Sequence, residues 1–344
     1  MTDTPDAPDT LDTPAAAAAP DAPDAPVARD TPVGRAQAIL SALDGVILGQ
    51  EQVLRQMMVT LLAGGHGLLE GVPGTAKTLA VRSLAVSLDV AFGRVQFTPD
   101  LMPTDLTGVS ILDEARQSFV FREGPLFAEL LLADEINRAP AKTQAALLEA
   151  MQEGQVTVDG VTHPLPEAFT VFATQNPVEQ EGTYPLPEAQ LDRFLLKIEV
   201  DYPPRVAERG ILDRVSEGFR ADRPETFGLS PLARASDLLE MRAHVRAVHV
   251  EPAVRDYIVD IIRATREDPS LTLAASPRAG VALFRAAQAE AFLDSRDFVI
   301  PDDVKTLALP VLRHRVRLTP EAEVDGECPD DRLRLLLDRI QAPS

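Results

Sequence analysis

Residues 71–78 constrain the fold of this chain more than any other segment. Their sequence, Gly-Val-Pro-Gly-Thr-Ala-Lys-Thr, follows a short apolar run, Gly67–Glu70, and precedes a helical pattern from Leu79 to Leu88. A strand, a glycine-containing loop and a helix in this order open a βαβ unit. Backbone N–H groups of such a loop point at phosphate oxygens, and the helix N-terminus adds favourable partial charge. The segment therefore predicts a phosphate-binding loop.

The end of this loop carries the side chains with chemical roles. Lys77 is expected to reach the β- and γ-phosphates, and the Thr78 hydroxyl to ligate Mg²⁺. Ala76 stands where such loops normally have glycine, and we expect its methyl group to be tolerated if the residue keeps helical dihedrals. The alternative is an ordinary strand–helix turn that contains Lys-Thr. The predicted phosphate-binding residues are Gly71, Val72, Pro73, Gly74, Thr75, Ala76, Lys77 and Thr78.

A second apolar run ends in two acids. Leu130–Ala133 is followed directly by Asp134 and Glu135. A buried strand that ends in two carboxylates is unfavourable unless those acids have a function. We predict that Asp134 holds Mg²⁺ through water and that Glu135 orients and polarises the attacking water. The alternative, a solvated strand end with surface carboxylates, is disfavoured by the phosphate loop upstream.

A third apolar run, Phe169–Thr174, ends in Gln175-Asn176-Pro177. In a parallel sheet the carboxyl end of this strand can lie beside that of the Asp134 strand. Asn176 is then placed to hydrogen-bond the γ-phosphate or the nucleophilic water. The alternative is that Asn-Pro only initiates a turn, which is a common role for this dipeptide.

The remaining pattern divides the chain. Two further strands are predicted at Val95–Thr98 and Phe194–Val200, and strands that alternate with helices indicate an α/β domain with a parallel sheet covered on both faces. The last third of the chain is almost entirely helical in pattern. We expect a Pro-, Ala- and Asp-rich tail over 1–32, an α/β domain over 33–205, a linker over 206–229 and a helical domain over 230–344. The five helices expected after the linker are Ala233–Ala247, Pro252–Arg266, Pro277–Leu293, Pro301–His314 and Asp331–Ile340.

Composition excludes several classes of protein. Acidic residues outnumber basic ones 53 to 33, giving a net charge of −20, so broad non-specific binding to duplex DNA is not expected. A single cysteine, Cys328, excludes an internal disulfide framework and a cysteine-based zinc site. No apolar run reaches the roughly 18 residues of a membrane-spanning helix. These features predict a protein of the cytoplasm without a membrane span.

The motifs together resemble those of the MoxR family of AAA+ ATPases, a branch with an insert in helix 2. The resemblance runs from about residue 33 to residue 340 and leaves only the tail uncovered. The segments that carry it are the phosphate loop 71–78, the Walker B segment 134–140, the sensor 1 segment 173–177, the arginine-finger segment 182–194, the sensor 2 segment 276–279, and the lid segments 301–304 and 311–315. The resemblance implies a P-loop α/β nucleotide domain with a smaller helical lid, and ATP with Mg²⁺ as ligands.

The resemblance also assigns roles that spacing does not. Arg193 is expected to be the arginine finger that reaches the γ-phosphate of a neighbouring subunit, which implies a homo-oligomeric ring, a hexamer in the family's manner. The alternative is a surface pair with Asp192. Arg278 is expected to report on the γ-phosphate from the lid, within its own subunit or its neighbour's, or else only to cap a helix. Ile47 and Leu48 are expected to contact adenine.

Two inserted hairpins complete the expectation, one over 107–121 and one over 155–165, where Asp159-Gly160 is a strong turn signal. In related proteins such loops often face a central pore, so at least one is expected to contact the client. The function implied is chaperone-like remodelling of a protein, with a von Willebrand factor A (VWA) domain partner and metal-cofactor insertion as family precedents. The alternatives are a nucleic-acid motor or helicase loader, and a nucleotide-dependent switch. Direct nucleic-acid binding is not expected, because the 155–165 hairpin has no Lys or Arg.

Overall fold

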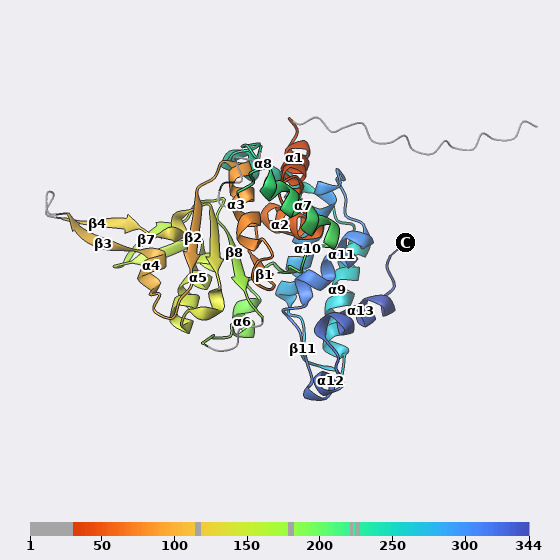
Figure 1. The fold of residues 1–344 in the computed structure, drawn as a ribbon. Helices are drawn as coiled ribbons and strands as arrows, with labels where there is room; N and C mark the ends of the chain where they lie inside the picture. The colour runs from red at the N-terminus through yellow and green to blue at the C-terminus, as the bar shows by residue number, and fades with distance from the viewer. Residues whose placement is uncertain (1–29, 114–117, 178–181, 221–222, 224–227, 344) are drawn as a thin grey trace, which may run out of the picture.

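A computed structural model describes residues 30–113, 118–177, 182–220, 223 and 228–343. The tail expected over 1–32 lies, except for its last three residues, outside the described residues. Figure 1 shows the sheet and its helices beside a group of helices from the C-terminal part of the chain.

The centre of the molecule is a five-stranded sheet in the order β2-β5-β8-β1-β9. Every pair of neighbouring strands in it is parallel. The strands are β1 (Gly67–Glu70), β2 (Phe92–Gln96), β5 (Leu130–Asp134), β8 (Thr170–Gln175) and β9 (Leu196–Glu199). The predicted parallel α/β sheet is confirmed, and the pairing of β5 with β8 brings their carboxyl ends together as expected.

Both faces of the sheet are covered, because successive side chains of a strand point to opposite sides. Leu130 and Leu132 of β5 belong to a core shared with helices α1 (Pro32–Asp44), α2 (Glu51–Leu62) and α3 (Lys77–Leu88). Leu131 and Ala133 belong to a second core that includes α5 (Ala141–Glu153). All five residues of β5 are buried. The run Leu-Leu-Leu-Ala is apolar throughout because neither of its faces meets water.

The C-terminal part of the chain is helical, as predicted. Its helices are α8 (Ala235–Ala247), α9 (Pro252–Glu267), α10 (Pro277–Leu293), α11 (Pro301–Leu312), α12 (Pro320–Val324) and α13 (Pro329–Arg339), joined by the short antiparallel pair β10 (Leu271–Leu273) and β11 (Arg317–Leu318). The segment expected as a linker over 206–229 contains a further helix, α7 (Arg205–Ser216).

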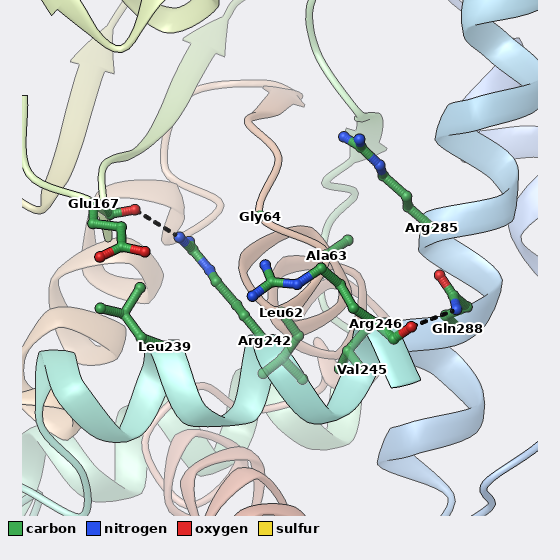
Figure 2. A pocket seen from close by; sticks show the side chains of 10 residues that line it. All are labelled: Leu62, Ala63, Gly64, Glu167, Leu239, Arg242, Val245, Arg246, Arg285 and Gln288. Atoms are coloured by element: carbon green, nitrogen blue, oxygen red, sulfur yellow. Dashed lines mark hydrogen bonds between the residues drawn. The ribbon is translucent and has the colours of Figure 1, made fainter. Parts of the chain in front are cut away.

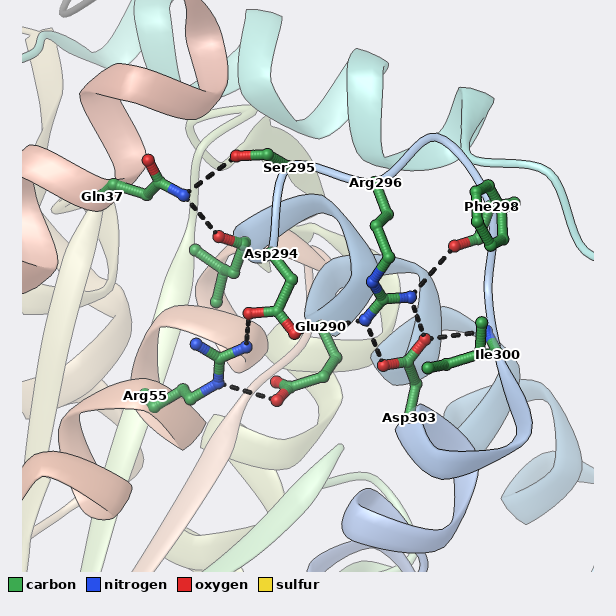
Figure 3. Close-up of polar contacts among 10 residues, drawn as sticks. Gln37, Arg55, Glu290, Asp294, Ser295, Arg296, Phe298, Ile300 and Asp303 are labelled. Carbon is green, nitrogen blue, oxygen red and sulfur yellow. Dashed lines mark hydrogen bonds and ion pairs between the residues drawn. The ribbon is translucent and has the colours of Figure 1, made fainter. Parts of the chain in front are cut away.

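Ion pairs join these helices to those at the start of the chain (Figure 3). Arg55 of α2 donates to Glu290 at 2.7 Å and to Asp294 at 2.5 Å, at the end of α10. Burial raises the pKa of the Glu290 carboxyl, and the charge of Arg55 opposes that effect. Beside them, Arg296 makes a two-pronged contact with buried Asp303 of α11. The C-terminal helices are therefore fixed to α2 by charge as well as by apolar packing.

Arg242 of α8 makes a second such connection (Figure 2). Its Nε donates to the Leu61 carbonyl at 2.9 Å and its Nη2 donates to the Thr170 hydroxyl at 2.7 Å, at the start of β8. Figure 2 shows the guanidinium directed toward the Glu167 carbonyl, to which Nη1 donates at 3.3 Å. Only 5% of Arg242 is exposed. Burial lowers its pKa to about 10, and the nearby charge of Arg246 adds to the effect. A cation this deep is tolerated because its donors are satisfied.

Both predicted hairpins are present. The first follows α4 (Pro103–Thr107) and pairs β3 (Gly108–Asp113) with β4 (Ser118–Glu123). The second pairs β6 (Gln155–Val158) with β7 (Val161–Pro164), and φ is positive at both Asp159 and Gly160 of its turn. Positive φ at both central residues is what a two-residue type I′ turn requires. The ring of Phe121 stacks on that of His163 with centroids 4.0 Å apart, so the two hairpins contact each other.

Three short helical segments complete the described elements. They are η1 (Pro125–Phe127), η2 (Ile136–Arg138) and α6 (Glu188–Leu191). The second of them follows Glu135 directly and the third precedes Arg193, so both lie next to residues with predicted chemical roles.

Candidate functional site

A cavity of about 700 Å³ lies at the carboxyl ends of β1, β5 and β8. Ligands of open parallel sheets bind at this edge. Most of the residues predicted to bind nucleotide or metal line this one cavity, namely Ile47, Leu48, Pro73, Gly74, Thr75, Ala76, Lys77, Thr78, Asp134, Glu135 and Asn176. The cavity is therefore the candidate nucleotide site.

The first two residues of the loop, Gly71 and Val72, lie outside the cavity wall and border a separate cavity. Gly71 has a packing role that explains its residue type, because a Cβ there would overlap the carbonyl oxygen of Val200 at the end of the neighbouring strand.

Ala76 corrects the expectation about its backbone. It has φ 62° and ψ 18°, in the left-handed region, and α3 begins only at Lys77. The condition of helical dihedrals is therefore not met, and the alanine occupies a conformation that glycine adopts without strain. The loop geometry requires positive φ here, as it does at Gly74, where φ is 86°.

The Lys77 ammonium lies inside the curve of the loop. Its Nζ donates to the Gly71 carbonyl at 2.6 Å and the Val72 carbonyl at 2.7 Å. Burial lowers its pKa, and the negative charges of Asp134 and Glu135 oppose that effect. The loop thus holds a positive charge in place next to its backbone N–H groups, which is the arrangement that a polyphosphate needs.

The Thr174 hydroxyl connects the two acids. It donates to Asp134 Oδ1 at 2.7 Å and accepts from the backbone N–H of Glu135 at 2.8 Å. Glu135 itself has φ 55°, in the left-handed region. Thr174 lies in β8, and Asn176 directly follows that strand. Sequence reasoning predicted a role for Asn176 and missed Thr174, although both lie at the carboxyl end of the same strand. Asn176 is 7% exposed and borders the same cavity.

Strand β2 supplies two more residues that sequence reasoning missed. Arg94 donates to Asp134 Oδ2 at 2.8 Å, and Gln96 donates to Glu135 Oε2 at 2.7 Å. Arg138 also contacts Glu135 Oε2, at 3.0 Å. The available signal was the alternation of exposed Arg94 and Gln96 around buried Val95, on a strand next to the acidic one.

The other end of the cavity is apolar. This end is lined by Val46, Ile47 and Leu48, and by residues of α7 and of the segment after α7. Sequence reasoning had assigned both of those segments to a linker. The lining residues from these two segments are Ile211, Arg214, Val215 and Phe219. Arg214 donates to the Val46 carbonyl at 3.0 Å. An apolar slot beside a phosphate loop suits a planar base.

The donors present also fit a magnesium ion. Thr78 and Asp134 offer oxygen ligands on one cavity, and Mg²⁺ takes only one or two protein oxygens together with water and phosphate. Within the described ranges no group of three or more His, Cys, Asp or Glu side chains could hold a metal by itself.

Arg193 and Arg278 do not line this cavity. Both line another one, of about 230 Å³, together with Asp192, Arg285 and Arg315. Arg193 Nη1 donates to the Leu148 carbonyl at 2.8 Å, and its buried Nε has no hydrogen-bond partner. Asp192 contacts Arg315 rather than Arg193, so the alternative of an Asp192–Arg193 pair does not hold.

Comparisons with known proteins agree with this arrangement. The sequence model of the ATPase family associated with various cellular activities (AAA) matches residues 66–196, and that of the AAA lid domain matches residues 263–335. Protein YeaC of Bacillus subtilis is 47% identical over 301 residues, which cover 88% of this chain and 92% of that protein. Chaperone MoxR1 of Mycobacterium tuberculosis is 44% identical over 312 residues, 87% of this chain and 80% of that protein.

A solved structure is similar over nearly the whole length. The crystal structure of a candidate ATPase from Cytophaga hutchinsonii superposes with a TM-score of 0.83 at 40% identity, covering 91% of this chain and 96% of that one. No helix in the described part of the chain has the length and apolar character needed to cross a membrane.

Proposed function

The chain belongs to the MoxR family of AAA+ ATPases, and from that premise we propose that it hydrolyses Mg²⁺-ATP at the interfaces of a ring of identical subunits to remodel a protein client. Nucleotide-dependent ATPase chemistry follows from the family. The ring, the magnesium dependence, the residue roles and the client are the proposal.

The proposed roles follow the contacts in the cavity. The backbone of Pro73–Thr78 and the Lys77 ammonium hold the phosphates, and Ile47 and Leu48 with the apolar face of α7 hold the base. Glu135 accepts a proton from the attacking water, and Asn176 orients that water or the γ-phosphate. Thr78 and Asp134 hold Mg²⁺, which when bound neutralises charge on the β- and γ-phosphates.

The observation that carries the ring is the separation of Arg193 and Arg278 from their own nucleotide cavity. The two arginines line a common cavity instead. In phosphoryl transfer, a guanidinium beside the γ-phosphate stabilises the negative charge of the transition state. The simplest arrangement has both arginines act on the nucleotide of the adjacent subunit. This assigns Arg278, like Arg193, a role in trans.

A mixing experiment tests this assignment. Arg193→Ala keeps an intact nucleotide cavity but offers no finger, and Lys77→Ala offers a finger but binds no nucleotide. We expect each variant to be inactive alone and the mixture to regain ATP turnover, because a Lys77→Ala neighbour completes the Arg193→Ala site. Arg278→Ala mixed with Lys77→Ala is expected to behave in the same way. A mixture as inactive as its components, with both variants shown to assemble by light scattering, contradicts action in trans.

The ring is proposed to be a hexamer, with the α/β domain over 33–205 and the lid over 230–344 meeting those of the next subunit. We propose that the hairpins β3–β4 and β6–β7 contact the client. Phe119 and Leu112 of the first hairpin are 75% and 57% exposed, and Val161 of the second is 57% exposed. Exposed apolar side chains on adjoining hairpins suit an unfolded or partly folded polypeptide. A VWA-domain partner and metal-cofactor insertion are the family precedents for this client.

A further inference from the structure

Arg94 contacts Asp134, the carboxylate that is proposed above to hold Mg²⁺. Its guanidinium lies 2.8 Å from Asp134 Oδ2, while the other oxygen, Oδ1, accepts from the Thr174 hydroxyl. Asp134 is 9% exposed and ends a fully buried strand. A carboxylate that is reserved for a cation in such a place would be left as an uncompensated buried charge whenever the cation leaves.

The placement of Arg94 follows from the sheet. Strand β2 is paired with β5 so that Gln96 lies opposite Asp134 and Arg94 opposite Leu132. Residues 94 and 96 point to the same side of β2, because side chains alternate along a strand. Arg94 reaches Asp134 and Gln96 reaches Glu135. The two acids are thus held by neighbouring positions of one strand, but only Asp134 receives a full positive charge from it.

The contact is also suited to being broken. Half of the Arg94 side chain is exposed, whereas 13% of the Asp134 side chain is. Arg94 borders the nucleotide cavity beside Lys77 and Thr78, so a guanidinium that leaves Asp134 stays within a space meant for phosphates. The half-exposed Arg94 guanidinium can be hydrated when it leaves Asp134, whereas the buried Asp134 carboxylate then needs another cation in its place.

We propose that Arg94 is a reversible substitute for the metal ion: it neutralises Asp134 while no divalent cation is bound, and it competes with Mg²⁺ for Oδ2. Arg94 is then a positioning residue that sets how strongly metal and nucleotide favour each other's binding. This rests on the proposed function, since it assumes that the cavity takes a nucleotide with Mg²⁺.

The test measures metal–nucleotide coupling without turnover. ADP carrying a fluorescent N-methylanthraniloyl group is titrated into the full chain with excess Mg²⁺ and, separately, with excess chelator. The coupling is the dissociation constant in chelator divided by the dissociation constant in Mg²⁺. Arg94→Ala removes the competitor and is expected to raise that ratio about tenfold if the pair is formed about nine-tenths of the time.

Two further variants separate competition from general damage. Arg94→Lys keeps a cation and is expected to stay within about threefold of the wild type. Arg138→Ala is the matched control, because Arg138 contacts Glu135 and not Asp134, and its coupling ratio is expected to stay unchanged. A ratio in Arg94→Ala equal to that of the wild type overturns the proposal, as does an equal rise in Arg138→Ala.

The outcomes also distinguish this proposal from the function on which it rests. Nucleotide binding and turnover by the wild type, with no change of coupling in Arg94→Ala, removes the role of Arg94 alone. Failure of the wild type to bind the labelled ADP in either condition removes the proposed function, and the role of Arg94 with it. Thermal unfolding of each variant shows whether it is folded. If Arg94→Ala is not, Arg94→Gln removes the charge while keeping most of the side-chain stem, and the same rise in the ratio is expected.

Discussion

Asp192 accepts a hydrogen bond at 2.7 Å from the Nε of Arg315, and this pair connects the arginine-finger segment to the lid. The same carboxylate accepts from the Ser276 hydroxyl at 3.3 Å, just before α10 begins. Arg315 also donates to the Phe194 carbonyl at 2.6 Å. Burial lowers the pKa of Arg315, and its hydrogen bond to Asp192 opposes that effect. The position of Arg193 relative to Arg278 therefore depends on the side chain of Asp192, the residue before Arg193.

Removing that carboxylate is expected to destabilise the fold. Only 3% of the Arg315 side chain is exposed, so Asp192→Ala leaves a buried guanidinium without its counter-charge. We expect the free energy of unfolding, measured by urea denaturation, to fall by about 2–3 kcal/mol, less than for a fully buried pair because 23% of the Asp192 side chain is exposed. Glu188→Ala is the control, because its pair with Arg317 is exposed and worth about 0–1 kcal/mol. Equal effects of the two substitutions contradict the role of Asp192.

Ala76→Gly is expected to stabilise the chain. The left-handed conformation of Ala76 costs about 1–2 kcal/mol, and glycine adopts it freely at the expense of about 0.5–1 kcal/mol of chain entropy. The net gain in the free energy of unfolding is expected to be about 0.5–1 kcal/mol. Ala80→Gly, in the interior of α3, is expected to change it by a similar amount in the opposite direction. A loss of stability in Ala76→Gly would show that the loop is not strained.

Lys77→Ala and Glu135→Gln are expected to fail at different steps. Lys77→Ala removes the charge held inside the loop, so binding of the labelled ADP is expected to weaken at least about 100-fold, as for a charge-assisted phosphate contact. Glu135→Gln keeps the loop but cannot accept a proton, so ATP binds and turnover falls about 100-fold or more. Turnover by Glu135→Gln at the wild-type rate removes Glu135 from the role of base.

Acidification is expected to destabilise the fold through His66. Burial lowers its pKa to about 4, and Nδ1 accepts a hydrogen bond from the Val171 N–H at 3.0 Å, so the folded state holds the ring neutral. The unfolded chain binds a proton near pH 6.5, so stability from this group is complete above that pH and is lost as pH falls toward 4. Between about pH 7.5 and 5.5 the loss is expected to be about 1 kcal/mol from His66.

Urea denaturation at the two pH values measures this loss. Burial also lowers the pKa of His314, which adds to the effect in the same direction. His66→Gln is expected to reduce the loss between the two pH values, whereas the matched change at exposed His244 is expected to leave it as in the wild type. An undiminished loss in His66→Gln contradicts the assignment.

Phe119→Ser tests the client-binding hairpin. The side chain is 75% exposed, so stability is expected to change by less than about 0.5 kcal/mol. Stimulation of ATP turnover by an unfolded protein, reduced and alkylated lactalbumin, is expected to fall, because apolar contact area is lost. Val161→Ser provides the matched change on the second hairpin. Undiminished stimulation in both variants, or stimulation by duplex DNA instead, contradicts the proposed client contact.

Much of the architecture could be predicted because it depends on local pattern. Strand β1 and helix α10 have the predicted bounds, and β5 and β8 end one residue later than predicted, at Asp134 and Gln175. Apolar runs of strand length, proline at helix starts and glycine in loops are local signals with a direct physical cause. The helix α7 was missed because it is rich in charged residues and directly follows Pro203-Pro204, a composition that indicated a linker.

The amino-acid sequence by itself predicted which side chains lie together in the nucleotide cavity, because Lys77, Thr78, Asp134, Glu135 and Asn176 follow from strand ends and loop composition. Tertiary structure decided what those side chains touch. The contact of Arg94 with Asp134 depends on β2 lying next to β5, and the common cavity of Arg193 and Arg278 depends on where the lid packs. The left-handed backbone of Ala76 is likewise imposed by the loop as a whole. Local pattern reports burial and propensity, whereas partners distant in sequence are fixed only when the sheet order and the packing of helices bring them together.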